Sequence, residues 1–385
     1  MSEPGTAPIG IGVVGYGSMA RAHSHAYRAL AVASPGAPPV RLVAISGRDA
    51  GAVAAAALDF GFERASGAWQ AVVEDPEIAL VDICTPPGHH PEVITAAAQA
   101  GKAILCEKPL AADYPAALGA VQSAERANVL AAIGFNYRRL PALALMKRLI
   151  DEGRIGTVTH MRAIWLTDEF IDPQTPFDWR FDRASGGTTI ADLGAHLIDL
   201  AHWMIADISS VSAQSTTVTR ERPDARTGKL RPVEVDDSST AIVRFGDGTR
   251  GIFEMSRISA LHPCDFTFEV NGDRGSVRFE YPRLNELWLG EIVDGPELYG
   301  MRRIRVEHQE HPGVPPWWPI GQGLGYDTSF VNQIDGLLAS WPNGPWEPSL
   351  REGLKVQAVC DAMERSALEE RWVKTAEIEE EAVAG

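Results

Sequence analysis

Three polar residues have the types and the setting needed for proton and hydride chemistry. Asp192 and His196 are four residues apart within a helical pattern, so they share one face of the helix. An imidazole there can act as a general base and a carboxylate can orient it, although a helix with a merely solvated polar edge has the same spacing. Lys108 follows the apolar run of residues 103–106 and precedes Pro109. An ammonium group at such a strand end could hydrogen-bond a substrate oxygen and stabilise its developing charge, whereas a surface lysine is the simpler alternative.

Residues 12–20 read G-V-V-G-Y-G-S-M-A and follow the first apolar run of the chain. This is a dinucleotide-binding fingerprint with Ala20 as its third small residue. Gly15 would permit a tight turn, and Gly17 would let a pyrophosphate approach the backbone at a helix N-terminus. A glycine-rich turn without function is the alternative, but the position at the first β–α junction favours a cofactor. We expect contacts to the cofactor from Gly15, Tyr16, Gly17, Ser18 and Met19.

The end of the second predicted strand bears on which dinucleotide is bound. A carboxylate at this position binds the ribose of NAD, whereas a small residue followed by arginine can accept the 2′-phosphate of NADP. Gly47 and Arg48 therefore favour NADP over NAD as the cofactor. Asp49 could still supply the carboxylate if the alignment shifts by two residues, and Arg48 could be simply exposed to solvent.

Cysteine usage and charge exclude several other classes of protein. The chain of 385 residues has a net charge of −16, which argues against nucleic acid or an anionic membrane as partner. Its four cysteines form no C-x-x-C pair, which fits a reducing compartment, and no apolar run approaches the ~18 residues of a membrane span. Asp192 and His196 could ligate a metal, but no Cys or clustered His completes such a site. We expect a cytoplasmic protein without a bound metal.

The elements that must position these residues change character along the chain. Up to residue 133, short apolar runs alternate with alanine-rich helical patterns, which predicts an α/β domain with a doubly wound parallel sheet, a Rossmann fold, over residues 1–134. Residues 135–385 are expected to form an α+β domain. Turn residues at 246–249 and 271–275 predict hairpins of a large, mainly antiparallel sheet. Helices at residues 187–205, 329–340 and 350–369 are expected to cover this second sheet.

Several motifs together resemble a known family. They are G-Y-G-S-M-A-R-A-H at 15–23, T-P-P-G-H-H at 85–90, E-K-P-L at 107–110, F-N-Y-R at 135–138 and G-G-T-T-I-A-D-L-G-A-H-L-I-D at 186–199. In this order they resemble the glucose-fructose oxidoreductase, inositol dehydrogenase and MocA (Gfo/Idh/MocA) family of NAD(P)-dependent oxidoreductases, over nearly the whole chain. Residues 177–180, 253–257 and 318–326 are similar to its levoglucosan dehydrogenase-like branch of sugar and cyclitol dehydrogenases.

The resemblance implies roles for individual residues. Lys108, Asp192 and His196 match the catalytic lysine, aspartate and histidine, and Glu107 matches a cofactor-binding glutamate. By position, further contacts to the cofactor are expected from Thr85, Pro86, His90, Lys108 and Asn136. Besides the three catalytic residues, contacts to the substrate are expected from Arg138, Trp165, Trp179, Arg180, His311 and Trp318. Trp165 could equally be a core residue, and Trp317 with Trp318 could cover a subunit interface.

The implied reaction is hydride transfer between a ring CH–OH of a sugar, anhydrosugar or cyclitol and nicotinamide. Two alternatives remain: a redox-neutral enzyme that cleaves glycosides with tightly bound NAD, and a dinucleotide-sensing regulator without turnover. The family also implies a homodimer or homotetramer formed through the C-terminal sheet. This chain departs from the branch at Gly47, where an acid is usual, and at residues 87–89, where polar residues often precede the matching histidine.

Overall fold

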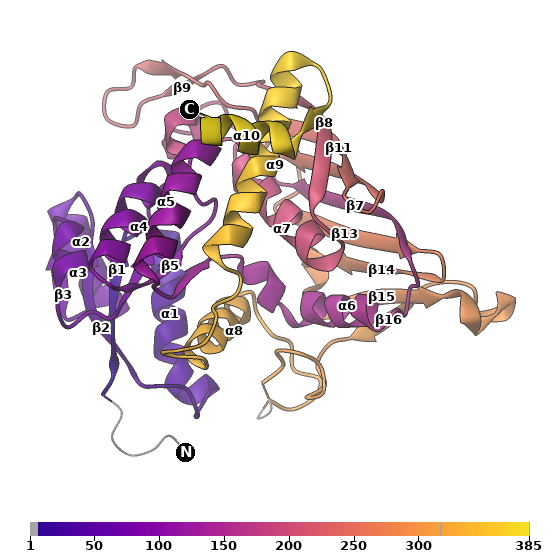
Figure 1. Cartoon of the computed structure of the whole chain (residues 1–385), viewed down its shortest axis with the longest axis horizontal. Helices are drawn as coiled ribbons and strands as arrows, with labels where there is room; N and C mark the ends of the chain where they lie inside the picture. Colours follow the sequence, from indigo (N-terminus) through magenta and orange to yellow (C-terminus); the bar gives the residue numbers. More distant parts are fainter. Residues whose placement is uncertain (1–6, 316–317, 385) are drawn as a thin grey trace. The chain divides into compact units, whose positions relative to one another are not determined.

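The computed structural model describes residues 7–315 and 318–384 (Figure 1). The chain forms two units, and the first of them is discontinuous in sequence. Among the described residues, no helix is both long enough and apolar enough to cross a bilayer. The first unit comprises Met1–Asn136 and Tyr326–Leu354, and the second comprises Tyr137–Gly325 and Lys355–Gly385.

Short apolar runs build the sheet of the first unit. β1 (Ile9–Val14) is buried along its whole length, as expected for a strand covered on both faces. Six strands pair in parallel in the order β3-β2-β1-β4-β5-β6, so the predicted doubly wound sheet is confirmed. The other strands are β2 (Val40–Ser46), β3 (Arg64–Ser66), β4 (Leu80–Ile83), β5 (Ala103–Cys106) and β6 (Ala131–Ile133).

The strand order reverses between β1 and β4. Ligands of such sheets bind beyond the carboxyl ends of the strands at this reversal. The loops that follow β1, β4 and β5 therefore border the candidate cofactor site. Helices alternate with the strands: α1 (Ser18–Ala33), α2 (Ala50–Phe60), α3 (Gln70–Glu74), α4 (His90–Gln99) and α5 (Tyr114–Ala127).

α8 (Asp327–Leu338) belongs to the first unit and packs against α1 (Figure 1). Phe330 and Ile334 of α8 lie in one buried cluster with Ile11 of β1. The expectation that residues 329–340 cover the antiparallel sheet is therefore wrong. The first domain expected from the sequence, residues 1–134, does not include this segment, whereas the first unit of the structure does. An amphipathic pattern shows that a helix has a buried face, but it does not show which unit that face meets.

The second unit contains a nine-stranded sheet in the order β16-β15-β14-β13-β7-β12-β11-β8-β17. All neighbours are antiparallel except β7 and β12, which confirms the predicted mainly antiparallel sheet. A separate ribbon pairs β9 (Glu221–Pro223) with β10 (Leu230–Pro232). The strands are β7 (Val158–Leu166), β8 (Ile208–Thr216), β11 (Ser238–Phe245), β12 (Arg250–Ser256), β13 (Asp265–Gly272), β14 (Gly275–Glu280), β15 (Glu286–Glu291), β16 (Arg302–Arg305) and β17 (Val373–Lys374).

This sheet has one covered face and one open face. Along β11, Ala241 and Val243 are buried, whereas Thr240, Ile242 and Arg244 are exposed. This alternation is typical of an antiparallel sheet with helices on one side. α6 contacts β14 and β15 on the covered side. The larger helices that include residues of this unit are α6 (Pro141–Asp151), α7 (Ala195–Met204), α9 (Leu350–Glu369) and α10 (Thr375–Ala384).

Candidate functional site

The loop between β1 and α1 forms an open cradle. Gly15 has a φ of +113°, and a Cβ there would lie 2.5 Å from the carbonyl oxygen of Cys84, so only glycine fits. Gly17 is the N-cap of α1 and has no side chain to bind the amides of the first turn, which begins at Ser18 and Met19. A Cβ on Gly17 would meet no described atom within 4 Å. The loop therefore leaves room for a pyrophosphate in front of these amides.

The end of β2 presents an exposed cation, and the nearest carboxylate along the chain caps a helix. A Cβ on Gly47 would lie 2.1 Å from the ring of Tyr16, so the ring occupies the space that an acidic side chain would need. Asp49 is the N-cap of α2, and its Oδ1 accepts a hydrogen bond from the Ala52 amide at 2.8 Å. Arg48 is exposed.

His90 links the loops that follow β4 and β5. Its Nδ1 lies 2.9 Å from the carbonyl oxygen of Pro109, and its Nε2 lies 2.7 Å from that of Thr85. The ring is fully buried, and burial lowers its pKa below the usual value. His90 therefore holds the two loops together through its two hydrogen bonds. Thr85 and Pro86 are partly exposed.

Glu107 and Lys108 follow β5 directly. The Glu107 side chain is only 6% exposed, so it points into the unit. Its Oε2 accepts the Lys108 amide proton at 3.1 Å, and its Oε1 lies 2.9 Å from His23 Nε2. Both carboxylate oxygens are thus bound by groups of the protein itself.

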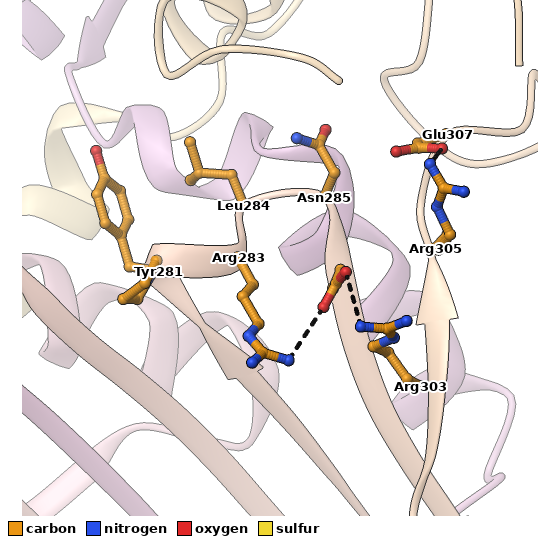
Figure 2. Close-up of a pocket in the computed structure, with 9 residues that line it drawn as sticks. Tyr281, Arg283, Leu284, Asn285, Arg303, Arg305 and Glu307 are labelled. Carbon is orange, nitrogen blue, oxygen red and sulfur yellow. Dashed lines mark ion pairs between the residues drawn. The ribbon is translucent and has the colours of Figure 1, made fainter. Parts of the chain in front are cut away.

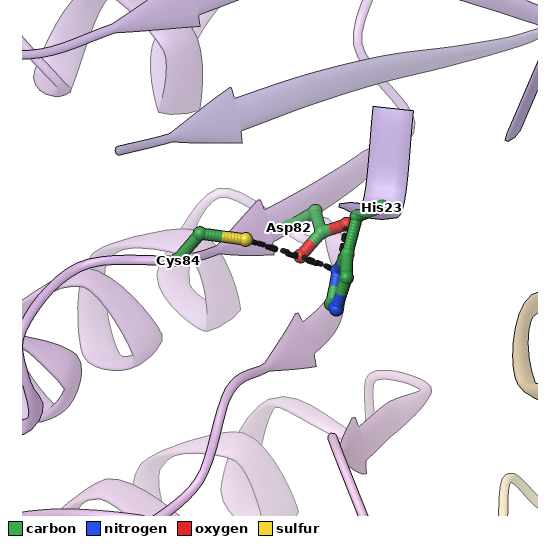
Figure 3. Close-up of side chains that lie close together, drawn as sticks. All are labelled: His23, Asp82 and Cys84. Atoms are coloured by element: carbon green, nitrogen blue, oxygen red, sulfur yellow. Dashed lines mark hydrogen bonds and ion pairs between the residues drawn. The ribbon is translucent and has the colours of Figure 1, made fainter. Parts of the chain in front are cut away.

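A buried cluster of His23, Asp82 and Cys84 lies next to Glu107 (Figure 3). One ligand-type atom from each residue lies within 4.8 Å of the others, as in a metal site. These atoms bind one another, since His23 Nδ1 lies 3.0 and 2.9 Å from the two Asp82 oxygens and the Cys84 thiol donates to Asp82 at 3.5 Å. The sequence prediction missed this cluster, because a lone histidine within a helix is usually a core residue.

Burial and charge act in opposite directions on this cluster. Burial, the largest single influence, would lower the pKa of His23, but the charges and hydrogen bonds of Asp82 and Cys84 together outweigh it and raise that pKa well above 6.5. Burial raises the pKa of the Cys84 thiol. Both shifts favour a protonated imidazole between the carboxylates and a neutral thiol beside it.

Asn136 is buried, and its amide nitrogen donates to the Tyr326 hydroxyl at 3.0 Å and to the Ser329 hydroxyl at 2.8 Å. Ser329 lies on α8, so these bonds join the segment of residues 326–354 to the end of the first sheet. The sequence assigned Asn136 to the cofactor and did not foresee these partners.

In the second unit, Asp192 and His196 lie on consecutive helical turns. Asp192 is part of a π-helical turn, Ile190–Gly194, which continues directly into α7. Such turns are rare and are often found at functional sites. A Cβ on Gly194 would lie 2.7 Å from the sulfur of Met255 in β12, so the glycine permits close packing of this turn on the sheet.

Two arginines flank the Asp192 carboxylate. Its Oδ2 lies 3.6 Å from Arg180 Nε and 3.9 Å from an Arg257 guanidinium nitrogen. Arg257 is fully buried and donates to the carbonyl oxygens of Gly187 at 3.0 Å and Asp236 at 2.9 Å. Arg180 was predicted from the sequence as a substrate contact, but Arg257 was given no role. The one feature that could have indicated Arg257 is its position as a cation directly after a strand.

The His196 ring is packed between aromatic side chains. Its centroid lies 4.6 Å from that of Tyr137 and 5.6 Å from that of Trp165. Trp165 is buried and also stacks on Phe266 at 5.0 Å, so it lies in an aromatic layer that supports the imidazole.

The other residues expected at the substrate have varied surroundings. Arg138 is buried and binds Asp199, with its Nε 3.0 Å from Oδ2, and the Arg180 guanidinium lies 4.5 Å from the ring centroid of Trp179. His311 accepts a hydrogen bond from the His308 amide at 3.2 Å, and burial lowers its pKa.

Trp318 is partly exposed, and its amide donates to Pro315 at 3.2 Å. Trp317 lies outside the described residues. Lys108 belongs to the first unit, whereas Asp192 and His196 belong to the second.

A separate hollow of about 630 Å³ lies at the β15–β16 edge of the second sheet (Figure 2). Arg283 and Arg303 both face Glu286, at 3.6 and 3.4 Å, and Arg305 pairs with Glu307 at 2.7 Å. These pairs neutralise most of the charge, and no residue predicted for the site lines the hollow.

Comparison with known proteins agrees with this geometry. The model of an oxidoreductase family with an NAD-binding Rossmann fold, GFO_IDH_MocA, matches residues 9–135. The model of the GFO/IDH/MocA C-terminal domain matches residues 143–278. The resemblance predicted from the motifs is therefore confirmed.

Named relatives cover nearly the whole chain. Levoglucosan dehydrogenase of Pseudarthrobacter phenanthrenivorans is 36% identical over 96% of this chain and 99% of its own length. Inositol 2-dehydrogenase of Rhizobium meliloti is 27% identical over 96% of this chain and 99% of its own. A solved levoglucosan dehydrogenase structure in complex with NADH and levoglucosan is 34% identical, with a TM-score of 0.92 over 96% of this chain and 100% of that one.

Proposed function

Because the chain belongs to the Gfo/Idh/MocA family of oxidoreductases, we propose that it is a dehydrogenase of a sugar, anhydrosugar or cyclitol. The reaction moves a hydride between a ring CH–OH and a nicotinamide dinucleotide. The observation that carries this proposal is the similarity to levoglucosan dehydrogenase over 96% of the chain. A sugar or anhydrosugar is favoured over a cyclitol, because the inositol dehydrogenase relative is less similar at 27% identity.

The first unit fits the cofactor. Gly15 and Gly17 leave a cradle at the N-terminus of α1, where free amides and the helix dipole favour a pyrophosphate. Thr85 and Pro86 border the same end of the sheet after β4. The nicotinamide, when bound, accepts the hydride from the sugar carbon.

Side chains of the protein bind the reacting hydroxyl group and accept its proton. Lys108 donates a hydrogen bond to the reacting hydroxyl oxygen and stabilises the negative charge that develops on it. The His196 imidazole takes the hydroxyl proton as the C–H bond breaks, so that an alcohol becomes a ketone. Asp192, held by Arg180 and Arg257, orients the reacting groups, and the aromatic layer around His196 keeps its ring in place.

For the cofactor we propose a preference for NADP over NAD. Tyr16 fills the space beside Gly47, and the Asp49 carboxylate is engaged as a helix cap, so β2 ends without an acid for the ribose hydroxyls. Arg48 is exposed beside this position and can pair with a 2′-phosphate. The relative with a solved complex holds NADH, so the proposed preference for NADP rests on these residues of the present chain alone.

We propose that the protein forms a homodimer or homotetramer through the open face of the nine-stranded sheet. Ile242 and Ile252 pair across β11 and β12 on this face and are 49% and 38% exposed. All four cysteines are free, which is consistent with the reducing cytoplasm as its compartment.

The proposed function is tested by incubating the protein with sugars, anhydrosugars and cyclitols and with either cofactor, while the absorbance of reduced nicotinamide is followed. Net reduction with at least one substrate is expected, and Lys108→Met should remove it. Glycoside cleavage without net reduction would instead indicate the redox-neutral reaction. Binding of cofactor without any turnover across the panel would indicate a regulator.

A further inference from the structure

A buried chain of hydrogen bonds leads from α1 to the backbone of Lys108. The Tyr27 hydroxyl donates to Asp82 at 3.0 Å, and Asp82 in turn faces His23 Nδ1 at 2.9 Å. The other ring nitrogen of His23 lies 2.9 Å from Glu107 Oε1. Glu107 then accepts the Lys108 amide proton through Oε2 at 3.1 Å. The chain thus ends at the residue proposed to bind the reacting oxygen.

The side chains that form this series of hydrogen bonds are closely packed. The side chains of His23 and Asp82 are 1% and 0% exposed, and Phe330 of α8 packs against the imidazole with a centroid distance of 5.5 Å. A Cβ on Gly134 would lie 2.7 Å from Glu107 Oε1, so the glycine makes room for the carboxylate. In this space Glu107 reaches both His23 and the Lys108 amide, and a side chain at position 134 would crowd it.

The hydrogen-bond partners of His23 favour one protonation state of its ring. Both ring nitrogens face carboxylate oxygens, and an ionised carboxylate only accepts hydrogen bonds, so ionised Asp82 and Glu107 require a proton on each nitrogen. The titratable groups in contact with the ring are Asp82, Cys84 and Glu107, the Tyr27 hydroxyl binds Asp82, and the neighbouring side chain from α8 is an uncharged phenylalanine. The raised pKa of His23 agrees with this state.

We propose that His23 is a positioning residue, an imidazolium that holds the Glu107 carboxylate on the Lys108 amide and thereby holds Lys108 at the end of β5. This inference rests on the proposed function, because Lys108 must act on the substrate for its position to matter. In this proposal the His23 imidazolium lies buried inside the first unit and does not contact the substrate. Its effect should therefore appear in the rate of hydride transfer and not in cofactor affinity.

The protonation state can be measured on the wild-type protein. Nitrogen-detected histidine spectra of ¹⁵N-labelled protein, with His23 assigned by its absence from His23→Gln, report both ring nitrogens. Imidazolium shifts that persist through pH 8 are expected. A neutral ring at pH 8, or titration near the ordinary value of 6.5, would overturn the inference.

The positioning role is tested by single-turnover reduction of cofactor. His23→Gln should slow the reaction about 10- to 100-fold, as expected for a small displacement of a reacting group, with cofactor affinity within about threefold of wild type. His25→Gln is the matched control on the same helix, because the His25 side chain is 57% exposed and pairs with the exposed Asp327 at 3.6 Å. Its rate should equal that of wild type.

A double-mutant cycle separates positioning from general stabilisation. If His23 acts through Glu107, then adding His23→Gln to the Glu107→Gln variant should slow hydride transfer little further. Additive losses in rate, or a loss matched by weaker cofactor binding, would overturn the proposal. Should His23→Gln fail to fold, Glu107→Gln breaks the same bond from the other side, and a wild-type rate in that variant would overturn it.

Failure of the proposed function would look different. A wild-type protein without turnover on any sugar would contradict the dehydrogenase assignment while leaving the ¹⁵N result intact. An active wild type whose Lys108→Met variant is equally active would remove the role of Lys108, and the proposal for His23 would fall with it.

Discussion

At the scale of single residues, the end of β2 shows how a neighbouring side chain limits what position 47 can hold. Gly47 follows β2, where the resemblance implies an acid, and the Tyr16 ring occupies the space that a Cβ would take there. A Gly47→Asp substitution would therefore displace Tyr16 as well as add a charge. Arg48 is exposed and offers a cleaner test of cofactor choice.

Arg48→Glu should lower the efficiency with NADP about 10- to 100-fold and change that with NAD little, because a charge-assisted bond to phosphate contributes about 1.5–3 kcal/mol. Steady-state kinetics with both cofactors measure this. Arg126→Glu is an exposed control on α5 with the same change in charge. An unaltered ratio of NADP to NAD efficiency would refute the role of Arg48.

Single residues also show what the sequence could and could not predict. Lys108, Asp192 and His196 could be proposed from the sequence because their types and spacing occur in a recognisable order, and their catalytic roles stay predictions. His23 and Arg257 were missed, since each is one ionisable residue in an otherwise apolar stretch and acquires meaning only from partners far along the chain. Asp82 is such a partner, 59 residues away from His23.

At the scale of elements, the parallel sheet and the hairpins were predicted, because local periodicity determines them. The packing of α8 on α1 was not, and neither was the π-helical turn at Ile190–Gly194. Both depend on tertiary contacts: the first on a complementary apolar face, and the second on the approach of Gly194 to Met255.

Gly194→Ala tests that approach. The added methyl would lie 2.7 Å from the Met255 sulfur, so the turn should shift, with a loss of about 1–3 kcal/mol in the free energy of unfolding and a lower kcat. Chemical denaturation and steady-state kinetics measure the two effects. Combining the change with Met255→Ala should destabilise the protein less than the sum of the two single variants. Strict additivity would show that the two sites do not press on each other.

A second element-scale prediction concerns the end of β15. Hydrogen bonds from Arg154 lower the pKa of Glu291, and a hydrogen bond from Arg302 lowers it further. Burial acts in the opposite direction but is outweighed, so the pKa falls to about 2. A lowered pKa contributes stability above the unfolded value of 4.5, and this contribution is lost as the pH falls towards 2. Because both arginines are nearly half exposed, we expect only about 1 kcal/mol.

Glu291→Gln should therefore lower the free energy of unfolding at pH 7, and its difference from wild type should shrink as the pH approaches about 2. Denaturation at several pH values measures this, with the exposed Glu297→Gln as control. A difference that is constant with pH would contradict the ion-pair explanation.

At the scale of the whole molecule, the open sheet face links fold to assembly. We expect Ile242→Arg to shift the protein from a dimer or tetramer towards monomer, because a charge would replace an apolar pair at the proposed interface. Light scattering after gel filtration measures the mass. Leu368→Arg, at a position on α9 that is 84% exposed, serves as control. A monomeric wild type, or an unchanged mass in the Ile242 variant, would exclude this face.

The central claim is that a ring C–H hydrogen of a sugar leaves as hydride. The most direct measurement uses levoglucosan deuterated at its hydroxyl-bearing ring carbons, with mass spectrometry of the nicotinamide formed from NADP or NAD. We predict reduced cofactor that carries one deuterium, formed together with an equal amount of ketone. Ketone without labelled cofactor, or no labelled cofactor from levoglucosan or any similarly deuterated sugar, would contradict the account.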